Sequence, residues 1–136
     1  MIAFALTAMY SCEEDPLNNS DDPRDKSRGD WKCYETSELF GDQTYQVEIY
    51  KDDLSDNKII INNFSGLGYG FEAFAIVDGK NLDFPQQTID NTMISGSGEV
   101  VDNYNTIEWT FDFELVDTKK GAKRIMDSML ATYEKQ

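Results

Sequence analysis

The stretch of sequence that decides the fold is Ile107-Glu-Trp109-Thr-Phe111-Asp-Phe113-Glu-Leu115. Every odd position in this stretch is apolar, and every even position is polar or charged. Successive side chains of a strand point to opposite faces, so a period of two predicts a strand with one buried face and one wet face. That pattern is typical of antiparallel sheet. The same alternation recurs from Asp30 onward, and we therefore expect an all-β protein.

Turn residues divide the alternating region into short strands, because pairs such as Asp78-Gly79 and Asp102-Asn103 are typical of tight hairpins. The expected strands are 30–37, 43–51, 58–64, 70–77, 80–84, 92–101, 106–116 and 126–135. Eight strands joined by hairpins conceal their edges best by closing into an antiparallel up-and-down barrel. For the last of these segments the periodicity alone favours a C-terminal helix, since the apolar residues between Ala122 and Tyr133 fall at helical spacing.

The composition excludes several classes of function. The chain of 136 residues carries 12 Lys and Arg against 26 Asp and Glu, which gives a formal charge of −14, and it contains no histidine. Nucleic acids bind through cations that neutralise phosphates, so we expect no nucleic acid partner. Without histidine, we find no set of nucleophile, base and orienting residue. We therefore expect no enzyme activity, no cofactor and no metal site, and we expect a monomer.

The beginning of the chain has the layout of a targeting segment. Residues 1–11 are uncharged and end directly before Cys12, after which the composition changes to Glu13-Glu14-Asp15. An apolar run of this length is too short for a membrane span, which needs ~20 residues, and the alternative is a buried first element. The run lacks the basic residues that usually precede it, which a start codon assigned too far downstream would explain.

This layout resembles a bacterial lipoprotein signal, in which the cysteine sulfur takes a diacylglycerol. We expect residues 1–11 to be the signal, 12–28 to be the lipidated Cys12 and a flexible acidic tether, and 29–136 to be the barrel. The acidic run behind Cys12 resembles the signal that sends Bacteroidetes lipoproteins to the outer face of the outer membrane. The resemblance implies an outer membrane lipoprotein that is exposed on the surface, with the periplasmic face as the alternative.

Further segments carry a resemblance in the barrel itself. Gly29-Asp30-Trp31 resembles the Gly-x-Trp opening of lipocalins and other calycins. The other segments, in chain order, are Asp22-Pro-Arg24-Asp25, Tyr45-Gln-Val47-Glu-Ile49, Ile59-Ile-Ile61-Asn-Asn-Phe64, Phe84-Pro-Gln-Gln-Thr-Ile89, Ile94-Ser-Gly-Ser-Gly98 and Ala131-Thr-Tyr133. Together they are similar to small lipocalin-like lipoproteins of Bacteroidetes, a family of unknown function. The resemblance implies that the segment around Ala131 is the strand that closes the barrel.

The alternation predicts which side chains point into the barrel. The candidate lining is aromatic: Trp31, Tyr45, Phe71, Trp109, Phe111, Phe113 and Tyr133. Small residues on the facing wall, among them Gly96 and Gly98, fit either a pocket or the interlocking of large and small side chains in a solid core. Cys33 faces the same interior. With Cys12 lipidated it has no disulfide partner, and we expect a buried, inert thiol.

We expect a non-catalytic binding module whose barrel mouth takes a small apolar or glycan-like ligand. The alternative is a protein-interaction module, either a protease inhibitor or an accessory subunit of an envelope complex. The expected partners are the membrane, through the lipid anchor, and a small ligand or an envelope protein. Five aspartates in loops assigned to the rim predict a negative mouth that favours neutral or cationic ligands: Asp52, Asp53, Asp56, Asp102 and Asp117.

Overall fold

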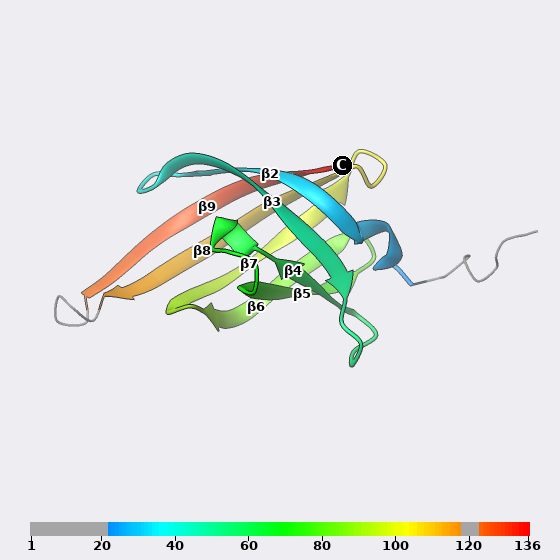
Figure 1. Cartoon of the computed structure of the whole chain (residues 1–136), viewed down its shortest axis with the longest axis horizontal. Helices are drawn as coiled ribbons and strands as arrows, with labels where there is room; N and C mark the ends of the chain where they lie inside the picture. Colours follow the sequence, from blue (N-terminus) through cyan, green and yellow to red (C-terminus); the bar gives the residue numbers. More distant parts are fainter. Residues whose placement is uncertain (1–21, 118–122) are drawn as a thin grey trace, which may run out of the picture.

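The computed structural model describes residues 22–117 and 123–136. These residues form a closed, antiparallel barrel in which each strand pairs with its neighbours in the chain (Figure 1). The strands are β2 (Gly29–Ser37), β3 (Gly41–Lys51), β4 (Lys58–Asn62), β5 (Glu72–Asp78), β6 (Asn81–Ile89), β7 (Thr92–Val101), β8 (Thr106–Asp117) and β9 (Lys123–Lys135). The predicted eight-stranded up-and-down barrel is confirmed.

The closing strand is β9, which pairs with both β8 and β2. Tyr133 lies opposite Cys33 on one side and opposite Ile107 on the other. The alternative of a C-terminal helix is therefore wrong. The apolar residues fall at helical spacing, but a strand here pairs with the edges of both β2 and β8, which a helix would leave unpaired.

Two strands end at places that the sequence pattern did not indicate. β4 stops at Asn62, and Phe64 belongs instead to the short 3-10 helix η3 (Phe64–Gly66). β6 runs on to Ile89, whereas the prediction ended this strand at residue 84. Its register shifts between Phe84 and Gln87, and a bulge of this kind accommodates Pro85, which has no N–H to donate.

One end of the barrel is covered by the residues that precede β2. The 3-10 helix η2 (Asp25–Ser27) lies across this end, where the Trp31 indole Nε1 donates to the Ser27 carbonyl at 2.9 Å. The buried guanidinium of Arg24 donates from Nη1 to the Asp52, Ser55 and Lys58 carbonyls at 2.6–3.1 Å. Residues 22–28 are thus packed against the barrel, and their assignment to the flexible tether is wrong.

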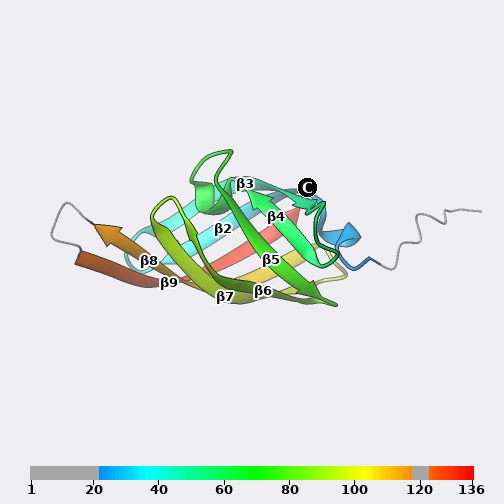
Figure 2. The ribbon, with the colours of Figure 1, turned by 90° about the horizontal axis from the view of Figure 1, so that it is seen from below.

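We call this end, with η2 and the C-terminus, the plugged end, and the opposite end the mouth (Figure 2). The mouth is formed by the turn 38–40, the loop 63–71 and the turn 90–91, and β8 and β9 extend beyond it. Up-and-down topology places the loops 52–57 and 102–105 at the plugged end. Four of the five aspartates that were expected at the mouth, all except Asp117, are therefore at the wrong end. No helix among the described residues is long and apolar enough to cross a bilayer.

Candidate binding site

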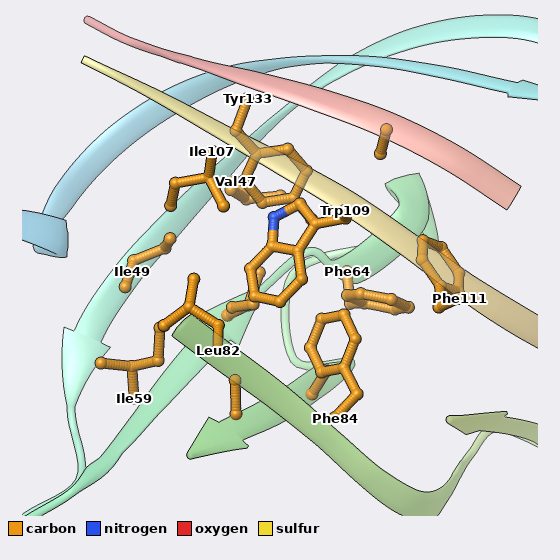
Figure 3. Packing of buried hydrophobic residues seen from close by; sticks show 14 of the residues in the cluster. Val47, Ile49, Ile59, Phe64, Leu82, Phe84, Ile107, Trp109, Phe111 and Tyr133 are labelled. Carbon is orange, nitrogen blue, oxygen red and sulfur yellow. The ribbon is translucent and has the colours of Figure 1, made fainter. Parts of the chain in front are cut away.

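Four of the seven predicted lining residues lie deep inside the barrel. Trp31, Trp109, Phe111 and Tyr133 are each no more than 2% exposed. Figure 3 shows the last three among the buried side chains of the core. The Trp109 ring stacks on Phe84 with ring centroids 4.3 Å apart and an interplanar angle of 16°. Aromatic pairs in this geometry contribute beyond the area that they bury. The central level of the barrel is thus an aromatic core.

Two glycines of β7 allow Trp109 and Phe111 of β8 to pack closely against this strand. Gly98 lies opposite Trp109 and Gly96 opposite Phe111 in the β7–β8 ladder. A Cβ atom on Gly98 would lie 2.4 Å from Cε3 of Trp109, and one on Gly96 would lie 2.5 Å from the Phe111 Cα. The Trp109 ring therefore lies over Gly98, and the backbone of Phe111 approaches Gly96, at two places where β7 has no side chain. At this level large and small residues interlock, as expected for a solid core.

Above this level the barrel is closed by Phe64 of η3. The Phe64 ring is buried, with its centroid 5.4 Å from Phe84 and 5.3 Å from Phe111. Figure 3 shows it between the two rings. The backbone reaches this position through left-handed residues, Asn63 at φ 66° and Ser65 at φ 54°. Non-glycine residues adopt such angles rarely, so the loop holds Phe64 inside at some conformational cost.

A buried carboxyl group lies next to η3. Glu35, on the inner face of β2, is 1% exposed. Its Oε1 accepts from the Tyr45 hydroxyl at 2.7 Å, its Oε2 accepts from Gln43 Nε2 at 2.7 Å, and the Ser65 hydroxyl lies within 3.0 Å of both oxygens. No lysine or arginine that the structure describes forms an ion pair with Glu35. The carboxyl is held only by neutral donors.

Polar groups below Glu35 are buried as well. Burial raises the pKa of the Cys33 thiol, and the charge of Glu35 raises it further. Burial likewise raises the pKa values of Tyr45 and Tyr133. The Tyr133 hydroxyl lies near Cys33 and Tyr45 but makes no hydrogen bond of ordinary geometry, and neither does Nε1 of Trp109. Two buried donors thus face the interior without a bonded acceptor.

The remaining predicted lining residues lie at the mouth. Tyr45 and Phe113 are half-buried, and Phe113 packs edge-on against the exposed Phe40 with centroids 5.4 Å apart. Phe71 is 37% exposed, so it belongs to the rim and not to the interior. Other large apolar side chains are exposed around it: Leu39, Leu67 and Tyr69. The mouth therefore carries an apolar rim.

Charge is distributed unevenly between the two ends. Every lysine and arginine side chain that the structure describes lies on the plugged half: Arg24, Lys26, Arg28, Lys32, Lys51, Lys58, Lys80 and Lys135. The mouth carries exposed acidic side chains, among them Glu38, Asp42, Glu72 and Asp90. Among the described side chains the mouth is thus acidic, through residues other than the four aspartates that lie at the plugged end. The basic run 119–124 lies outside the residues whose side chains the structure describes.

Two residues of this site were absent from the predicted lining. Glu35 could have been found, because Trp31, Cys33 and Glu35 alternate along one strand and share its inner face. The position of Phe64 had no local signal, since it depends on the left-handed turn that follows β4. No group of His, Cys, Asp and Glu in the described part of the chain is arranged to hold a metal ion.

No protein-family model and no curated protein sequence matches this chain. Two solved barrels are similar in structure. EF1p2_mFAP2b, solved bound to DFHBI, is 14% identical with a TM-score of 0.62, over 85% of this chain and 98% of that chain. A redesigned β-barrel, b11L5F_LGL, is 13% identical with a TM-score of 0.51, over 85% and 96%. At these identities the likeness shows the fold alone, a small β-barrel.

Proposed function

We propose that this chain is a non-catalytic binding module whose mouth takes a small apolar ligand. The observation that carries the proposal is the difference between the two ends. The plugged end is sealed by η2, Arg24 and Trp31, whereas the mouth exposes an apolar rim above an aromatic interior. Exposed apolar side chains gathered at one end of a fold are typical of interaction sites, ligand sites included. Binding of DFHBI by EF1p2_mFAP2b is consistent with such a use of a small barrel.

The chemistry of the described residues supports a non-catalytic role. The chain contains no histidine, and the Cys33 thiol is fully buried with a raised pKa. A thiol is a nucleophile only as its thiolate, so Cys33 is a poor candidate for covalent catalysis. The titratable groups near Glu35 among the described residues are Tyr45, Tyr133 and Cys33, and burial raises the pKa of each, which makes them poor acid or base partners at neutral pH. A binding module requires none of these groups.

The proposal includes a lipid anchor on Cys12, on the outer membrane and facing the exterior, or the periplasm as the alternative. Cys12 lies outside the described residues. The described chain begins at Asp22, which is at the plugged end. A tether that joins the barrel at this end leaves the mouth pointing away from the membrane. The anchor and the site are therefore compatible in geometry.

A protein-interaction module is the second candidate, and one feature of the outer surface favours it. Met126 and Leu130 of β9 are 67% and 58% exposed beside a surface hollow that Thr36 and Asp112 also line. Exposed apolar groups rimmed by polar ones are also typical of protein interfaces. An envelope protein or a protease is the kind of partner expected there.

A titration distinguishes the two candidates. The protein is mixed with the neutral apolar probe N-phenylnaphthylamine and, separately, with a fatty acid, while tryptophan and probe emission are followed. We expect the neutral probe to bind, and the fatty acid to bind more weakly because the acidic mouth repels its carboxylate. Replacing the rim residue Phe71 with Ser should weaken probe binding, whereas Leu130→Ser on the outer face should not. Unchanged emission with every probe, together with loss of an envelope partner in the Leu130→Ser variant, would favour the interaction module.

A further inference from the structure

Glu35 is a buried carboxyl group that has no cation beside it among the described residues. A buried carboxylate is costly unless a cation or a full set of hydrogen bonds compensates it. A carboxylate offers about four lone-pair positions. Tyr45, Gln43 and Ser65 supply one donor each, so one position is left over. Among the described residues no cation reaches it, and the site is therefore built for one more donor.

The loop 63–71 shows what kind of group fits here. Two consecutive residues of η3 enter the barrel: the Phe64 ring lies among Phe84 and Phe111, and the Ser65 hydroxyl bonds to Glu35. An aromatic ring joined by a short linker to a hydrogen-bond donor thus occupies the space between the core and the carboxyl. The chain itself fills the site with a group of this chemistry.

The same loop is built to move as a unit. Its internal hydrogen bonds join Asn63 Oδ1 to the Gly68 N–H at 2.7 Å and Asn62 Oδ1 to the Gly70 N–H at 2.8 Å. Ser65 holds a left-handed φ of 54°, which a serine adopts only under constraint. Moving η3 outward as a unit keeps these internal bonds but breaks its bonds to the barrel, from Ser65 Oγ to Glu35, from Gln43 Nε2 to the Ser65 carbonyl and from Asn63 Nδ2 to the Gln46 carbonyl. A competing ligand must therefore replace the bond to Glu35 and the packing of the Phe64 ring.

A second, independent observation points to a ligand at this place. The Tyr133 hydroxyl is fully buried beside Cys33 and Tyr45, where it makes no hydrogen bond of ordinary geometry. Acidic side chains at the mouth raise the local concentration of cations and lower that of anions.

We infer that Glu35 anchors the ammonium group of an arylalkylamine, whose aromatic ring takes the place of Phe64 when η3 moves outward. The inference rests on the proposed function, since it names the ligand class of the same site. An ammonium supplies the missing donor and the missing positive charge together. A neutral alcohol of the same shape supplies only the donor, and a carboxylate supplies neither.

The first test uses three isosteres on the unaltered protein: phenethylamine, phenethyl alcohol and hydrocinnamate. Affinities are measured by calorimetry, and displacement of the loop is followed through the amide resonances of Gly66 and Gly68. We expect phenethylamine to bind roughly tenfold or more tightly than the alcohol, as for a hydrogen bond to a charged partner, and hydrocinnamate to bind worst. The two glycine resonances should move with the amine.

The second test uses variants of Glu35 and of Ser65, the residue of η3 whose hydroxyl bonds to it. Glu35→Gln keeps the shape but not the charge, and it should reduce phenethylamine affinity roughly tenfold or more while changing alcohol affinity little. Glu38→Gln removes an exposed carboxylate at the same end and is the matched control. Ser65→Ala removes the competing hydroxyl from Glu35 and should tighten amine binding.

The outcomes separate this inference from the proposed function. Equal binding of the amine and the alcohol, or an unchanged amine affinity in Glu35→Gln, would overturn the role of Glu35 and leave an apolar site standing. If none of the isosteres and no neutral apolar probe binds, in the unaltered protein or in Ser65→Ala, both fail. Should the Glu35→Gln protein not fold, the three isosteres on the unaltered protein still decide the question.

Discussion

At the scale of single residues, Gly98 and Trp109 form one level of the barrel together. The Trp109 indole lies over Gly98, where a Cβ atom would be 2.4 Å from the Cε3 atom of the ring. The alternation of the sequence predicted that both residues face inward, and the structure buries Trp109 there. The pattern could not show whether Gly98 opens a pocket or receives the ring, because that depends on the side-chain torsions across the ladder.

Gly98→Ala should therefore destabilise the barrel. An added methyl group at this distance forces the Trp109 ring or the β7 backbone to shift, and overpacking of a core costs ~1–3 kcal/mol. Urea unfolding followed by tryptophan emission measures the loss. Ser97→Ala, next in the strand and exposed, should change the free energy of unfolding by less than ~0.5 kcal/mol. Equal stability of Gly98→Ala and the unaltered protein would show that the ring does not occupy this position.

At the scale of elements, most strands follow from period-two alternation and turn residues, but three elements do not. Helix η2 precedes the alternating region, and its place depends on the contacts of Arg24 with distant carbonyls. Helix η3 depends on left-handed residues after β4. The second half of β6 follows Pro85, which usually argues against a strand interior. Each was missed because tertiary contacts, and not local pattern, decide its conformation.

The seam between β5 and β6 shows such a contact. Their ladder pairs residues only from Ile76 with Asp83 onward, toward the plugged end. Closer to the mouth, the Gln87 side chain replaces the backbone ladder. Its Oε1 accepts from the Phe74 N–H at 2.9 Å, and its Nε2 donates to the Phe74 carbonyl at 2.9 Å. The carboxamide thus imitates a backbone partner and keeps this part of the wall closed.

Gln87→Ala should open this seam. Two backbone groups of Phe74 would lose their partner, at a cost of ~1–3 kcal/mol for unsatisfied, part-buried groups. Hydrogen exchange of the Phe74 amide should accelerate while exchange in β8 stays slow. Gln86→Ala, the neighbouring exposed glutamine, serves as the control. Protection of Phe74 that survives in Gln87→Ala would mean that water or another group closes the seam.

The contact between Asp22 and Arg24, beside η2 at the plugged end, makes the free energy of unfolding depend on pH. Hydrogen bonds from the Arg24 side chain, the largest effect, hold the pKa of Asp22 well below its usual range. A carboxyl whose pKa is lower in the folded state stabilises the fold above its unfolded pKa of about 3.9, and this contribution disappears as the pH falls further. Acid also relieves the repulsion of a chain with a formal charge of −14, so absolute stability combines two opposing trends.

Asp22→Asn isolates the first trend. At neutral pH the variant should be less stable than the unaltered protein, and the difference between the two should shrink as the pH is lowered through about 4 and below. Urea unfolding at a series of pH values measures it. Asp53→Asn, an exposed aspartate at the same end, should leave the difference near zero throughout. A constant gap between Asp22→Asn and the unaltered protein down to strongly acidic pH would exclude the proposed linkage.

At the scale of the whole molecule, most of the barrel was predictable from local alternation, whereas its closing strand was expected from the family resemblance, since the apolar spacing of that segment favours a helix. The polarity of the molecule was not predictable. The basic side chains that the structure describes lie on the plugged half and the apolar rim lies at the mouth, although neither group is contiguous in the chain. The predicted rim aspartates illustrate the reason. The predicted strand order already placed Asp117 at the opposite end from the other four, but which end is sealed depends on η2, which the alternation did not indicate.

This polarity gives the lipid-anchor hypothesis a geometric consequence. A diacylglycerol on Cys12 would hold the plugged end toward the bilayer, where the chain enters at Asp22, and present the mouth outward. Metabolic labelling with a fatty-acid analogue, in a bacterial host that lipidates lipoproteins, should mark the protein. Cys12→Ala should abolish the label, whereas Cys33→Ser should keep it because Cys33 is buried in the core. On intact cells, a protease that cleaves exposed tethers should then release a folded barrel only if the anchor faces the exterior. A protein that carries no label, or that keeps its label in Cys12→Ala, would contradict the anchor at this cysteine.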